Sequence, residues 1–332
     1  MDDRRLRSLA AGAGHHLAGW QRRFPLFQLL GLAMVCLLGV VSVDGFATPT
    51  SVDSILVLSS FLGLAALGQT LVILIGGFDL SIPAFILLGA TMIVELAGAD
   101  RWPFVAALAL AVAVAVVLGS MNGLICHLFR IQPLIVTLGM SAVVDGILQV
   151  WTGGTISGTV PGWLGALASP SARTLGLPIP PLPVLWLAFA VVVGVILQRT
   201  VPGRWMYATG ANLRAARLAL VPVGGVWVGA FAASALFSVL TGVLLAGFAP
   251  GDTSIGDPYL FEGLAAVIVG GTAFGARGDY WRTVLGALVL VVLTTVLVGH
   301  GLSDAAQQIL YGVVILVVVI GYGRDRRLRD QL

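Results

Sequence analysis

Long runs of apolar residues alternate with short polar stretches along almost the whole chain. Most runs approach the roughly 20 residues that a helix needs to cross a bilayer, and backbone groups in lipid must find their partners within the protein. The pattern predicts an all-α fold, a polytopic transmembrane helical bundle of about ten spans. The predicted spans are residues 26–43, 55–75, 82–97, 103–126, 133–151, 182–197, 226–247, 260–274, 283–299 and 307–322.

Some of these runs carry small residues in their interior, which is typical of short or broken membrane helices. The run 260–274 is the least regular, and we expect it to be short or broken. Glycines also interrupt the second and fifth runs, at Gly63, Gly68, Gly139 and Gly146. The predicted hinge or close-packing residues are Gly76, Gly77, Gly270, Gly271 and Thr272.

The arginines set the predicted orientation, because basic residues gather in cytoplasmic loops. With ten spans and a cytoplasmic N-terminus, every one of the 18 basic residues except Arg101 and Arg173 falls on the inner side. Both termini are therefore expected in the cytoplasm. The predicted organisation is a cytoplasmic N-terminal segment at 1–25, a transmembrane domain at 26–322 and a cytoplasmic tail at 323–332.

Composition excludes several classes of protein. Hydrophobic residues make up 58% of the chain and charged residues only 10%, whereas a soluble domain carries about 25% charged residues. The net charge of +3 reflects topological anchors beside anionic lipid, so no nucleic-acid partner is expected. Cys36 and Cys126 lie in apolar runs without metal-type spacing, and we interpret both as structural. We expect no metal site, no catalytic residues and no cofactor bound by this chain.

The inner loop at about 198–225 has an unusual pattern. Asn212 can cap a short helix formed by the residues after it. Helical spacing then places Leu213, Ala216, Arg217 and Leu220 on one face, with Ala215 beside it. We expect this helix to lie parallel to the membrane and to project small residues and arginine toward a cytoplasmic partner.

Four segments, in order, resemble motifs of the ribose-, xylose- and arabinose-type ABC permeases. The inner-loop motif of that family, G-R-x-x-x-A-x-G-x-N-x-x-A-A-R, is similar to residues 203–217, GRWMYATGANLRAAR. The other three are QTLVILIGGFDLS at 69–81, IQPLIVTLG at 131–139 and AAVIVGGT at 265–272. The resemblance extends over about residues 55–322.

The resemblance implies the permease subunit of a binding-protein-dependent monosaccharide importer in the bacterial cytoplasmic membrane, working by alternating access. Its implied partners are a cytoplasmic ATPase that holds ATP and Mg²⁺, a second permease chain, either identical or a sibling, and an external substrate-binding protein. The inner loop would dock on the ATPase. The implied coupling residues are Gly203, Arg204, Gly210, Asn212, Ala215, Ala216 and Arg217.

Polar residues within the apolar runs are candidates for the translocation path, because such residues usually face a cavity or a partner. Asp79 either lines the inner gate or holds a neighbouring helix terminus in place, or else, with Ser81 and Pro83, it caps the next segment at the membrane interface. Asp145 and Gln149 either line the path or make interhelical hydrogen bonds. The candidates are Gln69, Asp79, Ser81, Asn122, Thr137, Asp145 and Gln149.

Other functions stay open from the sequence alone. A related ABC permease could carry a nucleoside, a branched-chain amino acid or a signalling sugar. An ion-coupled secondary transporter usually needs paired ionisable groups at mid-membrane, for which only Asp79 and Asp145 are candidates. A membrane-embedded enzyme would need a cluster of His, Cys or carboxylate groups, which the sequence does not provide.

Overall fold

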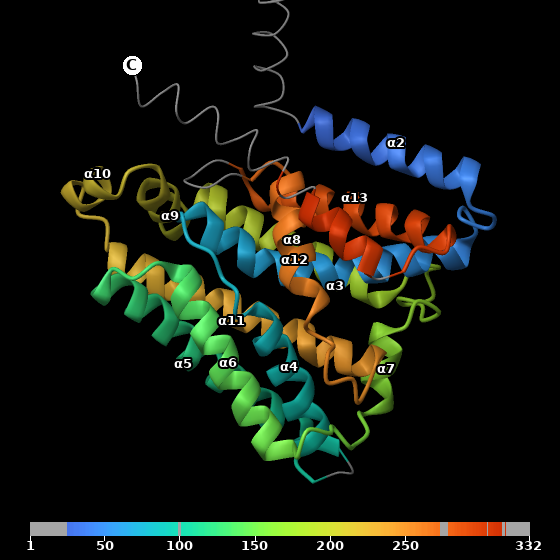
Figure 1. The fold of residues 1–332 in the computed structure, drawn as a ribbon, viewed down its shortest axis with the longest axis horizontal. Helices are drawn as coiled ribbons and strands as arrows, with labels where there is room; N and C mark the ends of the chain where they lie inside the picture. The colour runs from blue at the N-terminus through green and yellow to red at the C-terminus, as the bar shows by residue number, and fades with distance from the viewer. Residues whose placement is uncertain (1–24, 99–100, 273–277, 304, 314–315, 317–332) are drawn as a thin grey trace, which may run out of the picture.

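The computed structural model describes residues 25–98, 101–272, 278–303, 305–313 and 316. Helices dominate this part of the chain, and residues 305–313 are helical as well (Figure 1). The named elements are α2 (Leu26–Ser42), α3 (Pro49–Leu74), α4 (Ile82–Met92), the π-helical turn η1 (Ile93–Ala97), α5 (Phe104–Phe129), α6 (Pro133–Thr152), α7 (Gly162–Ala168), α8 (Pro181–Arg199), α9 (Val201–Ala211), α10 (Leu213–Leu218), α11 (Val223–Phe248), α12 (Pro258–Val269) and α13 (Tyr280–Gly299).

Six of these helices have the length and apolar composition that a membrane span needs: α3, α5, α6, α8, α11 and α13. Each coincides with a predicted apolar run to within six residues at either end. The prediction of a helical membrane protein is thus confirmed. The count of ten spans stays a prediction, and both termini lie outside the described residues.

The prediction that glycines interrupt the second and fifth spans is wrong, because α3 and α6 each run without a break. In α3 the glycines admit neighbouring helices. A Cβ on Gly63 would lie 2.2 Å from the ring of Trp186, and one on Gly68 would lie 2.7 Å from the backbone of Ser234. These glycines serve close packing in lipid, where small residues let helices approach.

The prediction for the run 260–274 is confirmed, because helix α12 ends at Val269. With 12 residues and a rise of about 1.5 Å per residue, α12 is about 18 Å long, short of the roughly 30 Å of a hydrocarbon core. A positive φ of 85° at Gly271 turns the chain away. The close packing predicted for Gly270 is also present, since a Cβ there would lie 2.3 Å from the carbonyl oxygen of Arg282.

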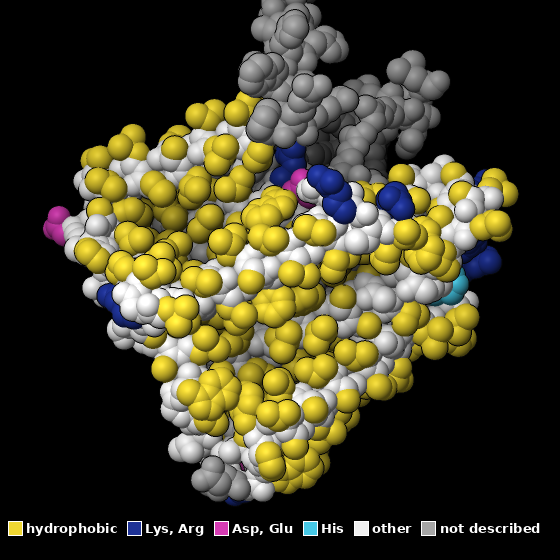
Figure 2. Space-filling view, turned by 180° about the vertical axis from the view of Figure 1, so that it is seen from behind, with side chains coloured by type: hydrophobic (Ala, Val, Ile, Leu, Met, Phe, Trp, Pro, Cys, Tyr) yellow, Lys and Arg dark blue, Asp and Glu magenta, His cyan; other side chains and the backbone are white. Residues whose placement is uncertain are grey.

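Helix α3 forms the centre of the bundle and is buried on all sides over most of its length. The long helix α11 packs against α3, α4 and α5, and α13 packs against α2, α3 and α12. Helices α9 and α10 lie at one end of the bundle, and α7 lies toward the other (Figure 1). Figure 2 shows hydrophobic side chains across most of one face, as a lipid-facing surface requires.

Two parts of the chain share an arrangement of a long helix, an irregular connection and a short helix. The first is α3 followed by α4, and the second is α11 followed by α12. Both short helices carry proline in their first turn, at Pro83 and Pro258, where its missing N–H costs nothing. The two starts meet, since a Cβ on Gly256 would lie 2.3 Å from the carbonyl oxygen of Pro83.

Candidate functional site

The connection between α3 and α4 carries the most buried carboxylate of the candidate set. Asp79 is only 2% exposed. Its Oδ1 accepts a 2.9 Å hydrogen bond from the backbone N–H of Ser81 and a second from the Ser81 hydroxyl. The carboxylate therefore folds the chain into a turn directly before α4. A positive φ of 89° at Gly76, one of the predicted hinge or close-packing residues, starts this connection.

The predicted cap by Asp79 does not hold in full. Ser81 occupies the N-cap position of α4, but its side chain makes no capping bond, and Asp79 lies two residues earlier. Asp79 is also buried within the protein. The expected cap is thus a buried turn, because α5, α6 and α11 pack over the connection.

Two helices hold this turn from outside through side chains in the candidate set. Asn122 of α5 donates from Nδ2 to the Ser81 hydroxyl at 3.1 Å. Thr137 of α6 accepts from the N–H of Leu80 at 3.0 Å and donates to the carbonyl oxygen of Pro133 at 2.9 Å. The buried polar cluster, defined as Asp79, Ser81, Asn122 and Thr137, thus joins three membrane segments.

Several polar atoms in and near this cluster are buried without a well-formed hydrogen bond to the described protein. They are Asp79 Oδ2, Asn122 Oδ1, Gln69 Oε1 and Ser234 Oγ. The Ser234 hydroxyl of α11 lies close enough to Asp79 to stabilise its charge, although the geometry is looser than a hydrogen bond. A buried polar atom without a hydrogen bond lowers the stability of the fold. We therefore expect this region to have a role in addition to packing.

Asp145 and Gln149 lie apart from the buried polar cluster. Asp145 is eight residues beyond Thr137 along α6, or about 12 Å at 1.5 Å per residue. It is half-buried and accepts a 3.4 Å hydrogen bond from Ser141, while Gln149 is exposed. Asp145 also lies within electrostatic range of Asp257, the residue before α12. The seven path candidates therefore divide between two places in the bundle.

The inner segment predicted to couple to an ATPase contains two helices, α9 and α10. The predicted cap is confirmed: Asn212 Oδ1 accepts from the N–H groups of Arg214 and Ala215, each at 3.0 Å. Helix α10 ends at Leu218, and Leu220 has a positive φ of 58°. Leu220 therefore does not extend the predicted helical face. Helix α9, which holds Gly203, Arg204 and Gly210, was not predicted.

Most predicted coupling residues are accessible. Arg204, Asn212, Ala215 and Arg217 are exposed, and Gly210 is half-buried. Gly203 and Ala216 are buried, so the prediction that Ala216 projects into the cytoplasm is wrong. Ala216 packs inward and holds α10 to the bundle, while Leu218 and Leu220 are 86% and 90% exposed. The segment presents arginine and leucine together, without any acidic residue between 201 and 220.

Helix α9 also reaches the connection between α12 and α13. The Tyr207 hydroxyl donates to the carbonyl oxygen of Gly278 at 3.0 Å. In the same connection Thr272 donates to the carbonyl oxygen of Asp279 at 3.2 Å, and Asp279 caps α13 through the N–H of Arg282. The inner segment is thereby attached to the start of a membrane helix.

Three further polar contacts of this region were not predicted. Gln28 of α2 donates to the carbonyl oxygen of Gly270 at 2.9 Å, at the end of α12. Trp186 of α8 donates to the Tyr280 hydroxyl at 2.9 Å, which in turn donates to the carbonyl oxygen of Gly63 at 2.6 Å. A polar side chain in an apolar run is the sequence signal for Gln28, whereas Tyr280 lies in the polar stretch before the predicted span 283–299, and neither position reveals its partner.

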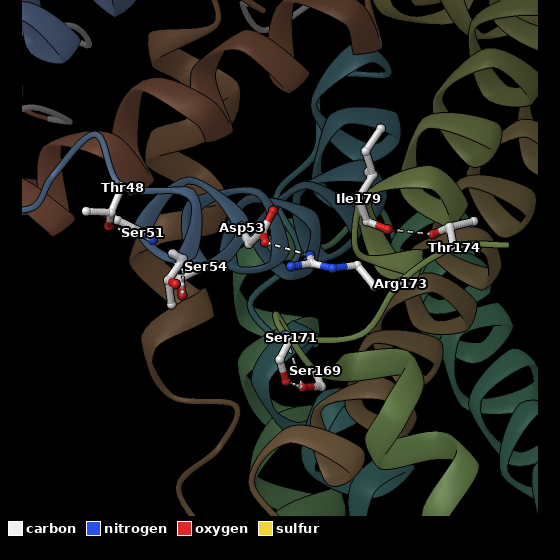
Figure 3. A network of polar contacts seen from close by, with 10 residues as sticks. Thr48, Ser51, Asp53, Ser54, Ser169, Ser171, Arg173, Thr174 and Ile179 are labelled. Carbon is white, nitrogen blue, oxygen red and sulfur yellow. Dashed lines mark hydrogen bonds and ion pairs between the residues drawn. The ribbon is translucent and has the colours of Figure 1, made fainter. Parts of the chain in front are cut away.

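At the opposite end of the bundle, one ion pair fastens the segment between α7 and α8. Arg173 Nη1 lies 2.9 Å from Asp53 Oδ2 on α3 (Figure 3). Glu95 accepts a 2.9 Å hydrogen bond from the N–H of Ser157. Both contacts order the long segment that follows α6.

Comparison with known proteins adds to this geometry. Residues 51–319 match the family model described as branched-chain amino acid transport system / permease component. The chain belongs to this family of ABC-importer permeases. The permease is 31% identical over 302 residues to the ribose import permease protein RbsC of Escherichia coli K12, covering 87% of this chain and 91% of the relative.

Two further relatives are similar over comparable lengths. The permease is 32% identical over 308 residues to the ribose import permease protein RbsC of Bacillus subtilis 168, covering 92% of this chain and 94% of that one. It is 31% identical over 302 residues to the autoinducer 2 import system permease protein LsrC of Enterobacter sp. strain 638, covering 89% and 86%. No solved structure matches the permease. The resemblance to monosaccharide-type permeases is confirmed.

Proposed function

We propose that this chain forms the membrane-spanning part of an ATP-driven importer for a monosaccharide or a related small polar solute. The observation that carries the proposal is the inner segment. An exposed, basic and capped helix, α10, continues from α9, which is hydrogen-bonded to the start of α13 through Tyr207 and Gly278. A partner that moves α9 and α10 would move a membrane helix with them.

In this proposal a separate cytoplasmic ATPase binds ATP and Mg²⁺ and docks on α10 and the residues after it. Arg214 and Arg217 would pair with acidic groups of the ATPase, while Leu218 and Leu220 would enter an apolar recess. Movement of α9 would pass through Tyr207 to the connection before α13. The contacts of Tyr280 with Trp186 and Gly63 would carry it on to α8 and α3. The result would be alternating access to a central path.

The remaining components follow from the same proposal. A second permease chain, either a copy or a sibling, would complete the path, and an external binding protein would deliver the solute. The complex would reside in the bacterial cytoplasmic membrane with both termini inside. The printed substrates of the relatives, ribose and autoinducer 2, make D-ribose and related sugars the first solutes to test.

Purification in mild detergent tests the partnership directly. The tagged permease should retain an ATPase subunit, and proteoliposomes holding the complex and its binding protein should import sugar only with ATP. A preparation without ATPase that moves solute under an ion gradient would contradict the proposal. Single-cysteine labelling checks orientation: positions 157, 169 and 254 should react from outside, and position 212 from inside.

Reversal of one charge tests the docking segment. Arg217→Glu should lower sugar uptake per ATP hydrolysed by about tenfold or more, because a repelled charge pair at an interface costs several kcal/mol. Arg101→Glu is the matched control, since Arg101 is exposed and predicted on the outer side. Equal coupling in the two variants would show that α10 does not dock on the ATPase.

A further inference from the structure

A cavity of about 360 Å³ lies between the start of α12 and the helix at 305–313. Its lining includes Asp257 directly before α12, Phe261 and Glu262 from the first turns of α12, and Gln307, Gln308 and Tyr311 from the other helix. The volume falls in the lower part of the range of small-molecule sites, about 300–1,000 Å³. A monosaccharide is smaller than most ligands of such sites, so this volume suits it.

The lining favours one chemical class of ligand. Carboxylates accept hydrogen bonds from hydroxyl groups, and amides both donate and accept them. Phe261, which is 48% exposed, offers an apolar surface for the C–H face of a sugar ring. Among the described residues that line the cavity, none is basic, and two, Asp257 and Glu262, are acidic. An uncharged solute rich in hydroxyl groups fits this set best.

The position of the cavity links it to a passage through the bundle. It lies at the start of α12, one of the two short helices whose starts meet near Pro83 and Gly256. In the predicted topology Ser254, which lines the cavity, lies on the outer side, so the cavity lies where a solute would enter the bundle from outside. Asp145 of α6 lies within electrostatic range of Asp257, which lines the cavity.

We propose that this cavity, between the start of α12 and the helix at 305–313, binds an uncharged polyhydroxylated solute during transport. The proposal rests on the importer function proposed above and names the residues that meet its substrate. Gln308 and Glu262 would hydrogen-bond the hydroxyl groups of the solute, and Phe261 would cover one face of the ring.

Uptake by the complete transporter tests the site. The permease, its ATPase and its binding protein are reconstituted in liposomes and supplied with radiolabelled D-ribose, D-xylose or L-arabinose. Gln308→Ala and Glu262→Ala should lower uptake about three- to tenfold, the effect of losing one hydrogen bond to a ligand. Gln308→Trp should lower it further by filling the cavity. ATP hydrolysis stimulated by the binding protein should remain in all three, because α9 and α10 are untouched.

Asp44→Asn provides the control, because Asp44 is an exposed carboxylate outside the cavity, between α2 and α3. Uptake by Gln308→Ala and Gln308→Trp equal to that of the control would overturn the cavity site and leave the importer function standing. A wild-type complex that hydrolyses ATP and imports none of the three sugars would instead overturn the proposed function, and the site with it.

Discussion

The Tyr207 hydroxyl lies 3.0 Å from the carbonyl oxygen of Gly278, although 71 positions separate the two residues. Burial, with a smaller contribution from the charge of Asp279, raises the pKa of Tyr207 to about 12, so its hydroxyl stays protonated and can donate at neutral pH. Gly278 has a φ of 115°, and a Cβ there would lie 2.5 Å from Thr272 Oγ1. The carbonyl oxygen of Gly278 is thus held in place, and it accepts the one hydrogen bond between α9 and this connection that the described residues show.

Replacing Tyr207 with phenylalanine should weaken transmission without unfolding the protein. A hydrogen bond contributes about 0.5–1.5 kcal/mol net, so sugar uptake per ATP hydrolysed should fall about two- to tenfold. The measurement is uptake and ATP hydrolysis in the same proteoliposomes. Trp205→Phe, a change to an aromatic neighbour on α9, is the control. The same uptake per ATP in both variants would show that the Tyr207–Gly278 bond transmits nothing.

The cap of α10 provides a second prediction. Asn212→Ala removes the acceptor for two N–H groups and should destabilise α10 by about 1 kcal/mol, whereas Asn212→Asp keeps an acceptor and should behave like wild type. Hydrogen exchange of residues 213–218 should speed up in the alanine variant alone. Retention of the ATPase in detergent should weaken in parallel. Faster exchange together with full ATPase retention would show that the ATPase does not need an ordered α10 to dock.

The sequence reveals those features of this fold that depend on neighbours along the chain. Asn212 caps a helix that begins at the next residue, and the long apolar runs become α5, α8 and α11 almost to their ends. Contacts between distant segments stay hidden. Gln28 and Gly270 are 242 positions apart, and the sequence around neither residue indicates the contact between them. Helix α9 was missed because its glycines and polar residues look like a loop.

The roles of the glycines likewise cannot be predicted from the local sequence. Gly63 and Gly270 both lie within apolar runs, yet Gly63 packs within a continuous helix while α12 ends just before Gly270. The difference depends on what each glycine faces, which is Trp186 in one case and the backbone of Arg282 in the other. A local pattern cannot contain that information, because both partners lie on other helices.

Steric contact at Gly270 leads to a third prediction. A Cβ there would meet the carbonyl oxygen of Arg282 at 2.3 Å, and backbone cannot move aside as a side chain can. Gly270→Ala should therefore destabilise the protein by about 1–3 kcal/mol, the usual cost of overpacking. Gly263→Ala on α12 is the matched control, because a Cβ there meets no atom within 4 Å. Thermal unfolding in detergent should separate the two variants.

Asp79 allows the structural and transport interpretations of a buried carboxylate to be separated. Its Oδ1 accepts two hydrogen bonds from Ser81, and an asparagine side chain in the same place can accept both. The amide nitrogen would then face the Ser234 hydroxyl, which can accept from it. If Asp79 serves to fold the connection, Asp79→Asn should retain uptake to within about twofold, as substitutions that keep local hydrogen bonding usually do.

Asp79→Ala should behave differently, because it leaves the Ser81 N–H buried without its acceptor. Each unsatisfied group costs about 1–3 kcal/mol, so the alanine variant should unfold at a lower temperature in detergent. Yield, unfolding temperature and uptake are measured on both variants. A folded Asp79→Asn protein that has lost uptake would show that the charge itself is needed. The buried polar cluster would then belong to the solute path. Asp79 would again be the main candidate residue for an ion-coupled mechanism.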